Sequence, residues 1–261
     1  MSLFNKKTIS RAIAPAILSA EAADASKRAL LGQWAGTIKS GEIETQKETA
    51  LHGNFKSKII VEVLGYSDFN DSGAWTVDVE AQIGAASVDL AFGHFTADKR
   101  NIIAPFELKG AKTKNLDAIM PGRAKSPVDQ AWEYATNNVG TKWVLVSNYL
   151  EIRLYSYGEG RQAYETFDLR RLHEPEEYAR AQLLLSAENL LGGRTAELLE
   201  ESRRENKDIT NRLYADYKTL RGDLIGEVRR ERPEMDPLDR TALSQCDDKI
   251  SRPGHTVSVD D

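Results

Sequence analysis

The sequence VDLAFGHFTADKRNIIAPFELKG, residues 88–110, decides the expected fold, because it reads as two apolar strands joined by a polar turn at residues 97–100. Successive side chains of a strand point to opposite faces, so Glu107 and Lys109 share one face of the second strand. Asp89 lies in the first strand. If the two strands pair through the turn, Asp89 comes close to Glu107. The sequence then predicts two carboxylates and an amine in one place.

These three polar side chains suit a metal-dependent hydrolysis. Two carboxylates can hold one Mg²⁺ ion, which prefers hard oxygen ligands and keeps several of its waters. A bound cation makes water a better nucleophile at neutral pH and stabilises charge that develops on a phosphate oxygen. Lys109 can orient that water or neutralise the phosphate, while Phe106 and Leu108 are expected to anchor the strand in apolar packing. The pattern predicts a metal-dependent phosphodiesterase.

The acid-x-lysine tripeptide alone is weak support. Other copies occur in stretches that read as helix or tail: Glu205/Lys207, Asp216/Lys218 and Asp247/Lys249. The copy at Glu107 differs because it ends an apolar strand and follows an acid on another strand. On pattern alone, a half-buried hairpin with a solvated polar face is an equally good interpretation. Asp78 and Glu80, on the alternating stretch 75–82, are rival carboxylates without a lysine in the right register.

Longer segments make the interpretation more specific. They are FELKGAKT at 106–113, SPVDQAWEYA at 126–135, WVLVSNYLEIRLY at 143–155 and LLSAENLLGG at 184–193. Together they resemble the amino-terminal nuclease region of single-chain restriction-modification enzymes, often called type IIG. In those enzymes a PD-(D/E)xK nuclease precedes a helical connector, an adenine-specific DNA methyltransferase and a target-recognition domain. The resemblance extends in order from about Lys47 to Arg240.

The resemblance implies roles for the residues at the end of the second strand. Asp89 and Glu107 match the metal ligands, the Leu108 carbonyl is a further ligand, and Lys109 matches the catalytic lysine. Val88 stands where the motif often has proline, a common departure. The implied cofactor is Mg²⁺, with Mn²⁺ as substitute, and the implied reaction is hydrolysis of double-stranded DNA that leaves a 5′-phosphate.

Residues on two expected helices would complete this site. By the resemblance, Gln130 and Tyr134 match a glutamine and a tyrosine that many such nucleases carry beside the metal. They are four residues apart and so share a helical face; a polar contact to the sheet with core packing is an equally good interpretation. Glu48 matches an acid that completes the metal site in some relatives, although an acid near a helix start is also favoured by the helix dipole.

A basic segment follows the site although the formal net charge of the chain is −5. Between residues 109 and 125 the basic side chains are Lys109, Lys112, Lys114, Arg123 and Lys125, against one acid, Asp117. Such a cluster can contact a DNA backbone, where phosphate contacts give affinity without reading sequence. A solvated loop is the alternative interpretation. The last four basic residues of the series are the predicted DNA contacts.

Composition sets the outer limits. With 261 residues, 41% of them hydrophobic, the chain can build one full core and a small appendage. The single cysteine, Cys246, excludes an internal disulfide and a cysteine-rich zinc site. The alanine-rich start is interrupted by polar residues and proline, so a cleaved signal peptide is not expected. No apolar stretch is long enough to span a bilayer. We expect a cytoplasmic protein without membrane contact.

The expected architecture is α/β: a PD-(D/E)xK restriction-endonuclease-like mixed sheet flanked by helices, with a C-terminal helical connector. We expect a nuclease domain at 1–192, the connector at 193–240 and a disordered tail at 241–261. Helices are expected at 21–39 and 42–64, before the first strand. No methyltransferase motif occurs in the sequence, so the methyltransferase and target-recognition modules are expected to be missing partners, and the chain reads as a fragment or frameshifted product.

Two other functions fit the same residues. The chain could be a noncatalytic remnant that binds DNA or a partner of the restriction system; the absent modules favour this, and the intact Asp89, Glu107 and Lys109 oppose it. A free-standing exonuclease is a third interpretation, suggested by Gln130 and Tyr134. It would cut linear but not circular DNA.

Overall fold

The computed structural model describes residues 2–69, 73–84 and 86–231. The first of two compact units ends at Asn206, and the second begins at Lys207. The sheet and the candidate site belong to the first unit. The expected tail at 241–261 and the end of the expected connector lie outside the described residues.

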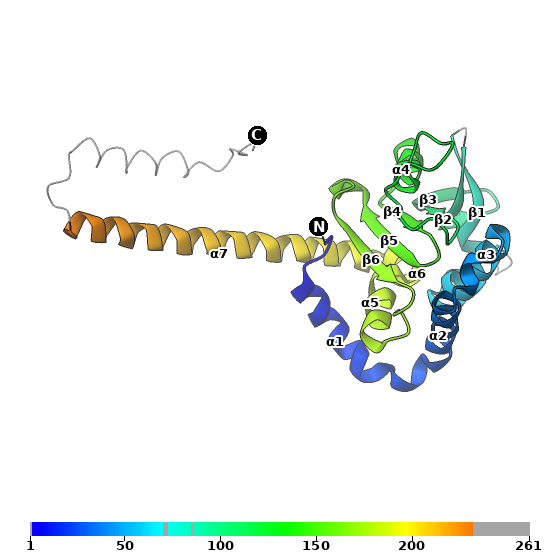
Figure 1. Ribbon diagram of the computed structural model, residues 1–261, viewed down its shortest axis with the longest axis horizontal. Coiled ribbons are helices and arrows are strands. Elements are labelled where there is room, and N and C mark those ends of the chain that lie inside the picture. Colours follow the sequence, from blue (N-terminus) through cyan, green and yellow to red (C-terminus); the bar gives the residue numbers. More distant parts are fainter. Residues whose placement is uncertain (1, 70–72, 85, 232–261) are drawn as a thin grey trace. The chain divides into compact units, whose positions relative to one another are not determined.

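One six-stranded sheet forms the centre of the first unit, with the strands side by side in the order of the sequence. All neighbouring strands are antiparallel except β3 and β4, which are parallel. The mixed α/β architecture is therefore confirmed (Figure 1). The strands are β1 Ala74–Ile83, β2 Ala86–Thr96, β3 Arg100–Leu108, β4 Trp143–Ser147, β5 Glu151–Ser156 and β6 Tyr164–Asp168.

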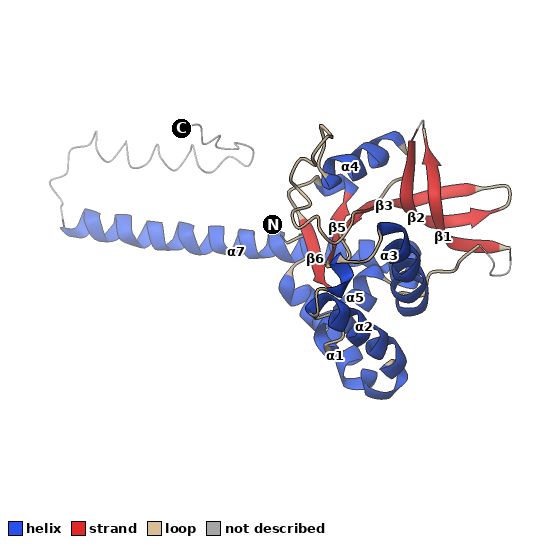
Figure 2. Ribbon diagram, turned by 45° about the vertical axis from the view of Figure 1, so that its right-hand side comes forward, coloured by secondary structure: helices blue, strands red, loops and turns tan. Residues whose placement is uncertain are grey.

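Helices cover both faces of this sheet (Figures 1 and 2). Strand β4 is buried along its whole length because alternate residues enter different cores. Val144 and Val146 pack with α4, while Leu145 packs into the main core with the other helices. The helices are α1 Lys6–Ala23, α2 Ala25–Lys39, α3 Glu48–Asn54, α4 Pro127–Asn137, α5 Pro175–Leu185, α6 Ala187–Gly192 and α7 Arg194–Glu231; the short 3₁₀ turns are η1 Glu42–Glu44 and η3 Tyr157–Glu159.

The N-terminal helices differ from the prediction. The helix expected to begin at residue 21 begins instead at Ala25, because the chain leaves helical geometry at Asp24 and the preceding residues form α1. The Asn5 side chain starts α1 by accepting bonds from the main-chain N–H groups of Lys7 and Thr8. Helix α1 was not predicted from the sequence.

The helix expected at 42–64 is not continuous. It consists of η1, α3 and the π-helix η2, Phe55–Val63, which continues directly from α3. Its apolar residues recur at steps of four from Leu51 to Val63, longer than the 3.6-residue turn of an α-helix. A wider turn with i→i+5 bonds keeps Leu51, Phe55, Ile59 and Val63 buried. Such π segments are frequent at functional sites.

Helix α4 begins as the sequence predicts. The Ser126 hydroxyl accepts a hydrogen bond from the Asp129 N–H at 3.0 Å, and the Asp129 carboxylate accepts one from the Ser126 N–H at 3.0 Å. Pro127 occupies the first turn, where a main-chain N–H would have no acceptor within the helix, so the missing N–H of proline costs nothing. This reciprocal cap fixes the start of the helix that lies beside the candidate site.

Helix α7 begins immediately after Gly193, whose positive φ of 102° ends α6. Leu198 and Leu199 of α7 are buried in the main core. Most of the large apolar residues of α7 beyond Asn206 are exposed, including Leu213, Leu220 and Leu224. None of the helices in the described part of the chain combines the length and apolar character that a membrane span requires.

The hairpin of β2 and β3 contains a bulge at Phe92/Gly93. Proline at residue 105 cannot donate a sheet hydrogen bond, so a bulge or a free edge is expected there. The observed bulge lies close to it, and pairing of β3 with β4 begins only at Phe106. At the bulge the two strands approach closely: a Cβ atom added to Gly93 would lie 2.0 Å from the main-chain oxygen of Asn101.

We predict that Gly93→Ala lowers the free energy of unfolding by about 2–3 kcal/mol, because both backbones must shift to admit the methyl group. The control is Gly53→Ala in α3, where an added Cβ meets nothing within 4 Å. Alanine should stabilise that helix by about 0.5–1 kcal/mol. Urea unfolding of both variants measures the difference, and equal midpoints for Gly93→Ala and wild type would contradict the prediction.

Candidate active site

Pairing of β2 with β3 brings together the two predicted carboxylates. Leu90 lies opposite Phe106, so the next residues, Asp89 and Glu107, face each other across the strands. The Leu108 N–H donates a hydrogen bond of 2.7 Å to Asp89 Oδ2, which ties this side chain to the end of β3. The predicted proximity of Asp89 and Glu107 is confirmed.

Glu107 is almost completely buried, with 1% of its side chain exposed. Its Oε1 atom accepts a hydrogen bond from the Lys109 ammonium group, so these two side chains share a face as predicted. The other oxygen, Oε2, is buried and has no hydrogen-bond partner. Phe106 and Leu108 point the other way into the main core, also as predicted.

The surroundings of Glu107 raise its pKa from 4.5 to about 7. Burial is the largest cause because it disfavours the charged form, and the nearby Asp89 carboxylate adds to it. The positive charges of Lys109 and Arg123 act in the opposite direction. A buried carboxylate with one unpartnered oxygen beside a second carboxylate fits a divalent cation, which would supply the missing contact.

Helix α3 places Glu48 near the end of β3. Glu48 is the first residue of α3 and is exposed. A Cβ atom added to Gly110 would lie 3.9 Å from the carboxyl carbon of Glu48. Among the described residues, however, no three histidine, cysteine or acidic side chains are grouped as a ready metal centre. A metal-binding role for Glu48, and for the Leu108 carbonyl, stays a prediction.

Strand β4 holds the other side of the site. The Lys109 N–H donates to the Ser147 carbonyl at 2.8 Å, continuing the contact of β3 with β4. The Ser147 hydroxyl accepts a hydrogen bond of 3.0 Å from the N–H of Tyr149. Tyr149 is fully buried, has a positive φ of 65°, and its hydroxyl has no hydrogen-bond partner.

Tyr149 lies near the candidate acids although no sequence pattern predicts it there. Burial raises the pKa of its hydroxyl, and the carboxylates of Glu48, Asp89 and Glu107 raise it further. The ring therefore lies within the electrostatic reach of all three acids. A tyrosine between two strands gives no signal of this kind in the sequence, because the turn that aims it is a tertiary feature.

Gln130 and Tyr134 on α4 are hydrogen-bonded to each other, Nε2 to hydroxyl, at 2.8 Å. Arg123 donates to Gln130 Oε1 at 3.2 Å. Burial raises the pKa of Tyr134, partly offset by the bond from Gln130, and Glu107 and Asp89 raise it further. Tyr134 thus lies within the electrostatic reach of both carboxylates, and a role of this pair beside a metal stays a prediction. The structure also supports the alternative interpretation in part, because Tyr134 packs in an apolar cluster.

The basic residues divide into two groups. Lys112 and Arg123 line a cleft of about 400 Å³ together with Lys109, Gly110 and Glu48. Lys114 and Lys125 form exposed ion pairs instead, with Glu44 and Glu133 respectively. The first group shares a cleft with the site, and the second is partly neutralised.

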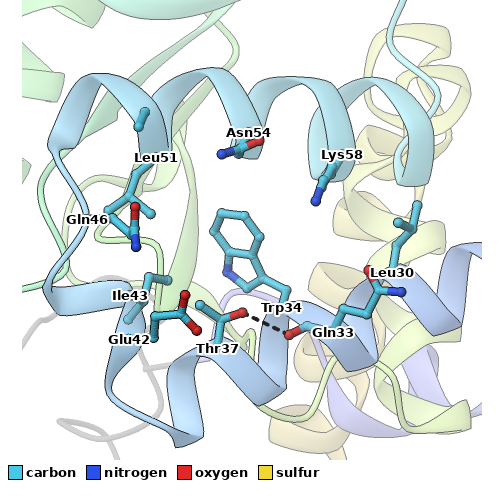
Figure 3. A pocket seen from close by; sticks show the side chains of 11 residues that line it. Leu30, Gln33, Trp34, Thr37, Glu42, Ile43, Gln46, Leu51, Asn54 and Lys58 are labelled. Carbon is cyan, nitrogen blue, oxygen red and sulfur yellow. Dashed lines mark hydrogen bonds between the residues drawn. The ribbon is translucent and has the colours of Figure 1, made fainter.

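A second cavity of about 300 Å³ lies between α2 and the α3–η2 helix (Figure 3). It shares Ile43, Gln46 and Leu51 with the first cleft. Trp34 stands at its centre and donates from Nε1 to the Tyr149 carbonyl at 3.1 Å. Asp89, Glu107 and Lys109 do not line it.

The rival carboxylates differ in their surroundings. Asp78 forms an ion pair of 2.8 Å with Arg100. Glu80 lies on β1 in register with Asp89, has a positive φ of 49°, and follows the exposed Val79, which breaks the expected alternation. His52 lies within the electrostatic reach of Asp89 and Glu80, and burial lowers its pKa. The four histidines are scattered along the sequence, and their spacing does not predict that His52 lies here.

Comparisons of the chain with known protein families, with curated proteins and with solved structures gave no match in any of the three. Any assignment of a reaction therefore rests on the geometry around Glu107.

We predict that stability in EDTA falls as pH rises from about 4.5 to about 7, because folded Glu107 holds a proton that the unfolded chain has released. The raised pKa of about 7 corresponds to a loss of about 3 kcal/mol across this window. Glu107→Gln should remove this slope. Urea unfolding across the window measures it, with Glu62→Gln, an exposed acid on η2, as control. An unchanged slope in Glu107→Gln would contradict the prediction.

Proposed function

We propose that this chain is a Mg²⁺-dependent endonuclease of the PD-(D/E)xK type that hydrolyses phosphodiester bonds of double-stranded DNA in the cytoplasm. It would serve as the nuclease part of a restriction-modification system, acting with a methyltransferase and a target-recognition module. The observation that carries the proposal is the Glu107 carboxylate, buried between Asp89 and Lys109 with one oxygen free of hydrogen bonds.

The residues of β2 and β3 would hold the cation. Asp89 and Glu107 would supply carboxylate oxygens, with the Leu108 carbonyl and Glu48 as further ligands. A bound Mg²⁺ supplies an acidified water and positive charge for the phosphate. Lys109 would be released from Glu107 Oε1 when the carboxylate turns to the metal, and its ammonium group would then orient the attacking water.

The cleft beside the carboxylates fits the DNA backbone. Lys112 and Arg123 line it, so their charges lie where a phosphate would approach the site. Phosphate contacts of this kind give affinity without sequence specificity. Gln130 would hold Arg123 in place through the hydrogen bond between them.

We predict that the wild type nicks supercoiled plasmid at low salt with Mg²⁺ or Mn²⁺, and that Asp89→Ala and Lys109→Ala lose at least about 100-fold in rate. Asp98→Ala, an exposed acid in the β2–β3 turn, should cut normally. EDTA serves as blank.

If all of these proteins cut equally, or if cutting persists in EDTA, the nicking activity does not come from this site. If none cuts, Mn²⁺ binding decides the assignment: a wild type that binds Mn²⁺ and an Asp89→Ala variant that does not would show an assembled but idle site. A wild type that binds DNA without cutting it or binding Mn²⁺ would be a noncatalytic remnant.

We predict that Lys112→Ala and Arg123→Ala each weaken DNA binding uniformly across sequences and reduce the slope of log affinity against log salt by about one. Lys114→Ala should have a smaller effect because Glu44 already neutralises that charge. Lys99→Ala, an exposed lysine in the β2–β3 turn, is the control. Fluorescence anisotropy at several salt concentrations measures the slopes, and equal slopes for all variants would contradict this DNA path.

A further inference from the structure

Tyr149 combines features that ordinary packing does not require. It is fully buried, yet its hydroxyl has no hydrogen-bond partner. An unpartnered hydroxyl in an apolar environment destabilises a protein, and phenylalanine would fill the same space without that cost. The positive φ of 65° is a second cost, since a bulky side chain rarely adopts this conformation. Strain of this kind gathers at functional sites.

The surrounding structure fixes Tyr149 in this conformation. Its N–H donates to the Ser147 hydroxyl at 3.0 Å, and its carbonyl accepts from Trp34 Nε1 at 3.1 Å. Its ring packs edge-on against Phe55 with centroids 5.3 Å apart. Because Ser147 also accepts the Lys109 N–H, the same residue anchors the proposed catalytic lysine and Tyr149.

The environment of the hydroxyl points to an acidic partner. Glu48, Asp89 and Glu107 act on it electrostatically, with Glu48 the strongest of the three. Asp89 Oδ2 and Glu107 Oε1 already accept hydrogen bonds, from the Leu108 N–H and from Lys109. The unpartnered Oε2 of Glu107 would bind the cation in the proposed site. Glu48 is exposed, at the start of α3, and lies near Gly110 at the end of β3. A movement of its side chain toward the site would give the hydroxyl an acceptor.

We propose that Tyr149 is a positioning residue whose hydroxyl donates a hydrogen bond to the Glu48 carboxylate and holds it toward Asp89 and Glu107 when a divalent cation binds. The inference rests on the proposed function. It also explains how Glu48 can complete a site in which no three ligands are grouped beforehand. Partners of this kind orient ligands, and their loss typically costs about 10–100-fold in metal affinity or activity.

The test compares Tyr149→Phe with Tyr66→Phe. Both tyrosines are fully buried, but the Tyr66 hydroxyl donates to the Leu185 carbonyl at 2.9 Å, away from the site. Tyr149→Phe should raise the urea midpoint slightly, while Mn²⁺ affinity by calorimetry and nicking rate each fall about tenfold. Tyr66→Phe should do the reverse: a lower midpoint with unchanged Mn²⁺ affinity and nicking.

A double-variant cycle identifies the partner. If Tyr149 acts through Glu48, then Glu48→Gln with Tyr149→Phe should lose no more Mn²⁺ affinity than Glu48→Gln alone. Additive losses would overturn the pairing, and wild-type affinity and nicking in Tyr149→Phe would overturn the positioning role while the nuclease stands. A wild type that neither binds Mn²⁺ nor cuts would overturn the proposed function itself, and this inference with it.

Discussion

The burial of one carboxylate, Glu107, is the constraint on which the site depends. An acid that leaves water loses hydration that only a partner of opposite charge or a hydrogen-bond donor can replace. Lys109 supplies one such contact, but the neighbouring Asp89 adds a like charge and the second oxygen has no partner. The protein therefore maintains a local instability at the end of a central strand. A cation at this position would relieve it.

The fold can sustain this instability because β3 is held on both sides. Phe106 and Leu108 are buried in the main core, and β2 and β4 flank the strand. Strand alternation then forces the residue between these two apolar side chains to the opposite face, toward α4. Two large apolar neighbours stabilise the strand enough to keep a polar side chain in an unfavourable place. The packing of Phe106 and Leu108 thus positions Glu107.

A feature could be predicted from the sequence where the residues that determine it lie close together along the chain. The meeting of Asp89 with Glu107 depends on strand alternation and one short turn, and the start of α4 depends on adjacent capping residues, so local patterns sufficed. The break at Asp24 does not follow from local propensity. The π-helix has a local signal in its four-residue apolar spacing, but this spacing is close enough to α-helical periodicity to be read as an α-helix. Tyr149 was missed because it reaches the acids through the β4–β5 turn, and the charged residues next to it in the sequence, Glu151 and Arg153, are not those acids.

Net charge and local charge also lead to different expectations here. A chain of net charge −5 is a poor general binder of a polyanion, and acids at the site would repel a phosphate further. Lys112 and Arg123 offset this only within the cleft. Before a cation binds, the carboxylates repel an approaching DNA phosphate while the basic side chains attract it. Once a divalent charge lies between Asp89 and Glu107, both groups favour the phosphate. Metal and DNA would therefore bind with positive coupling, since each improves the electrostatic environment of the other.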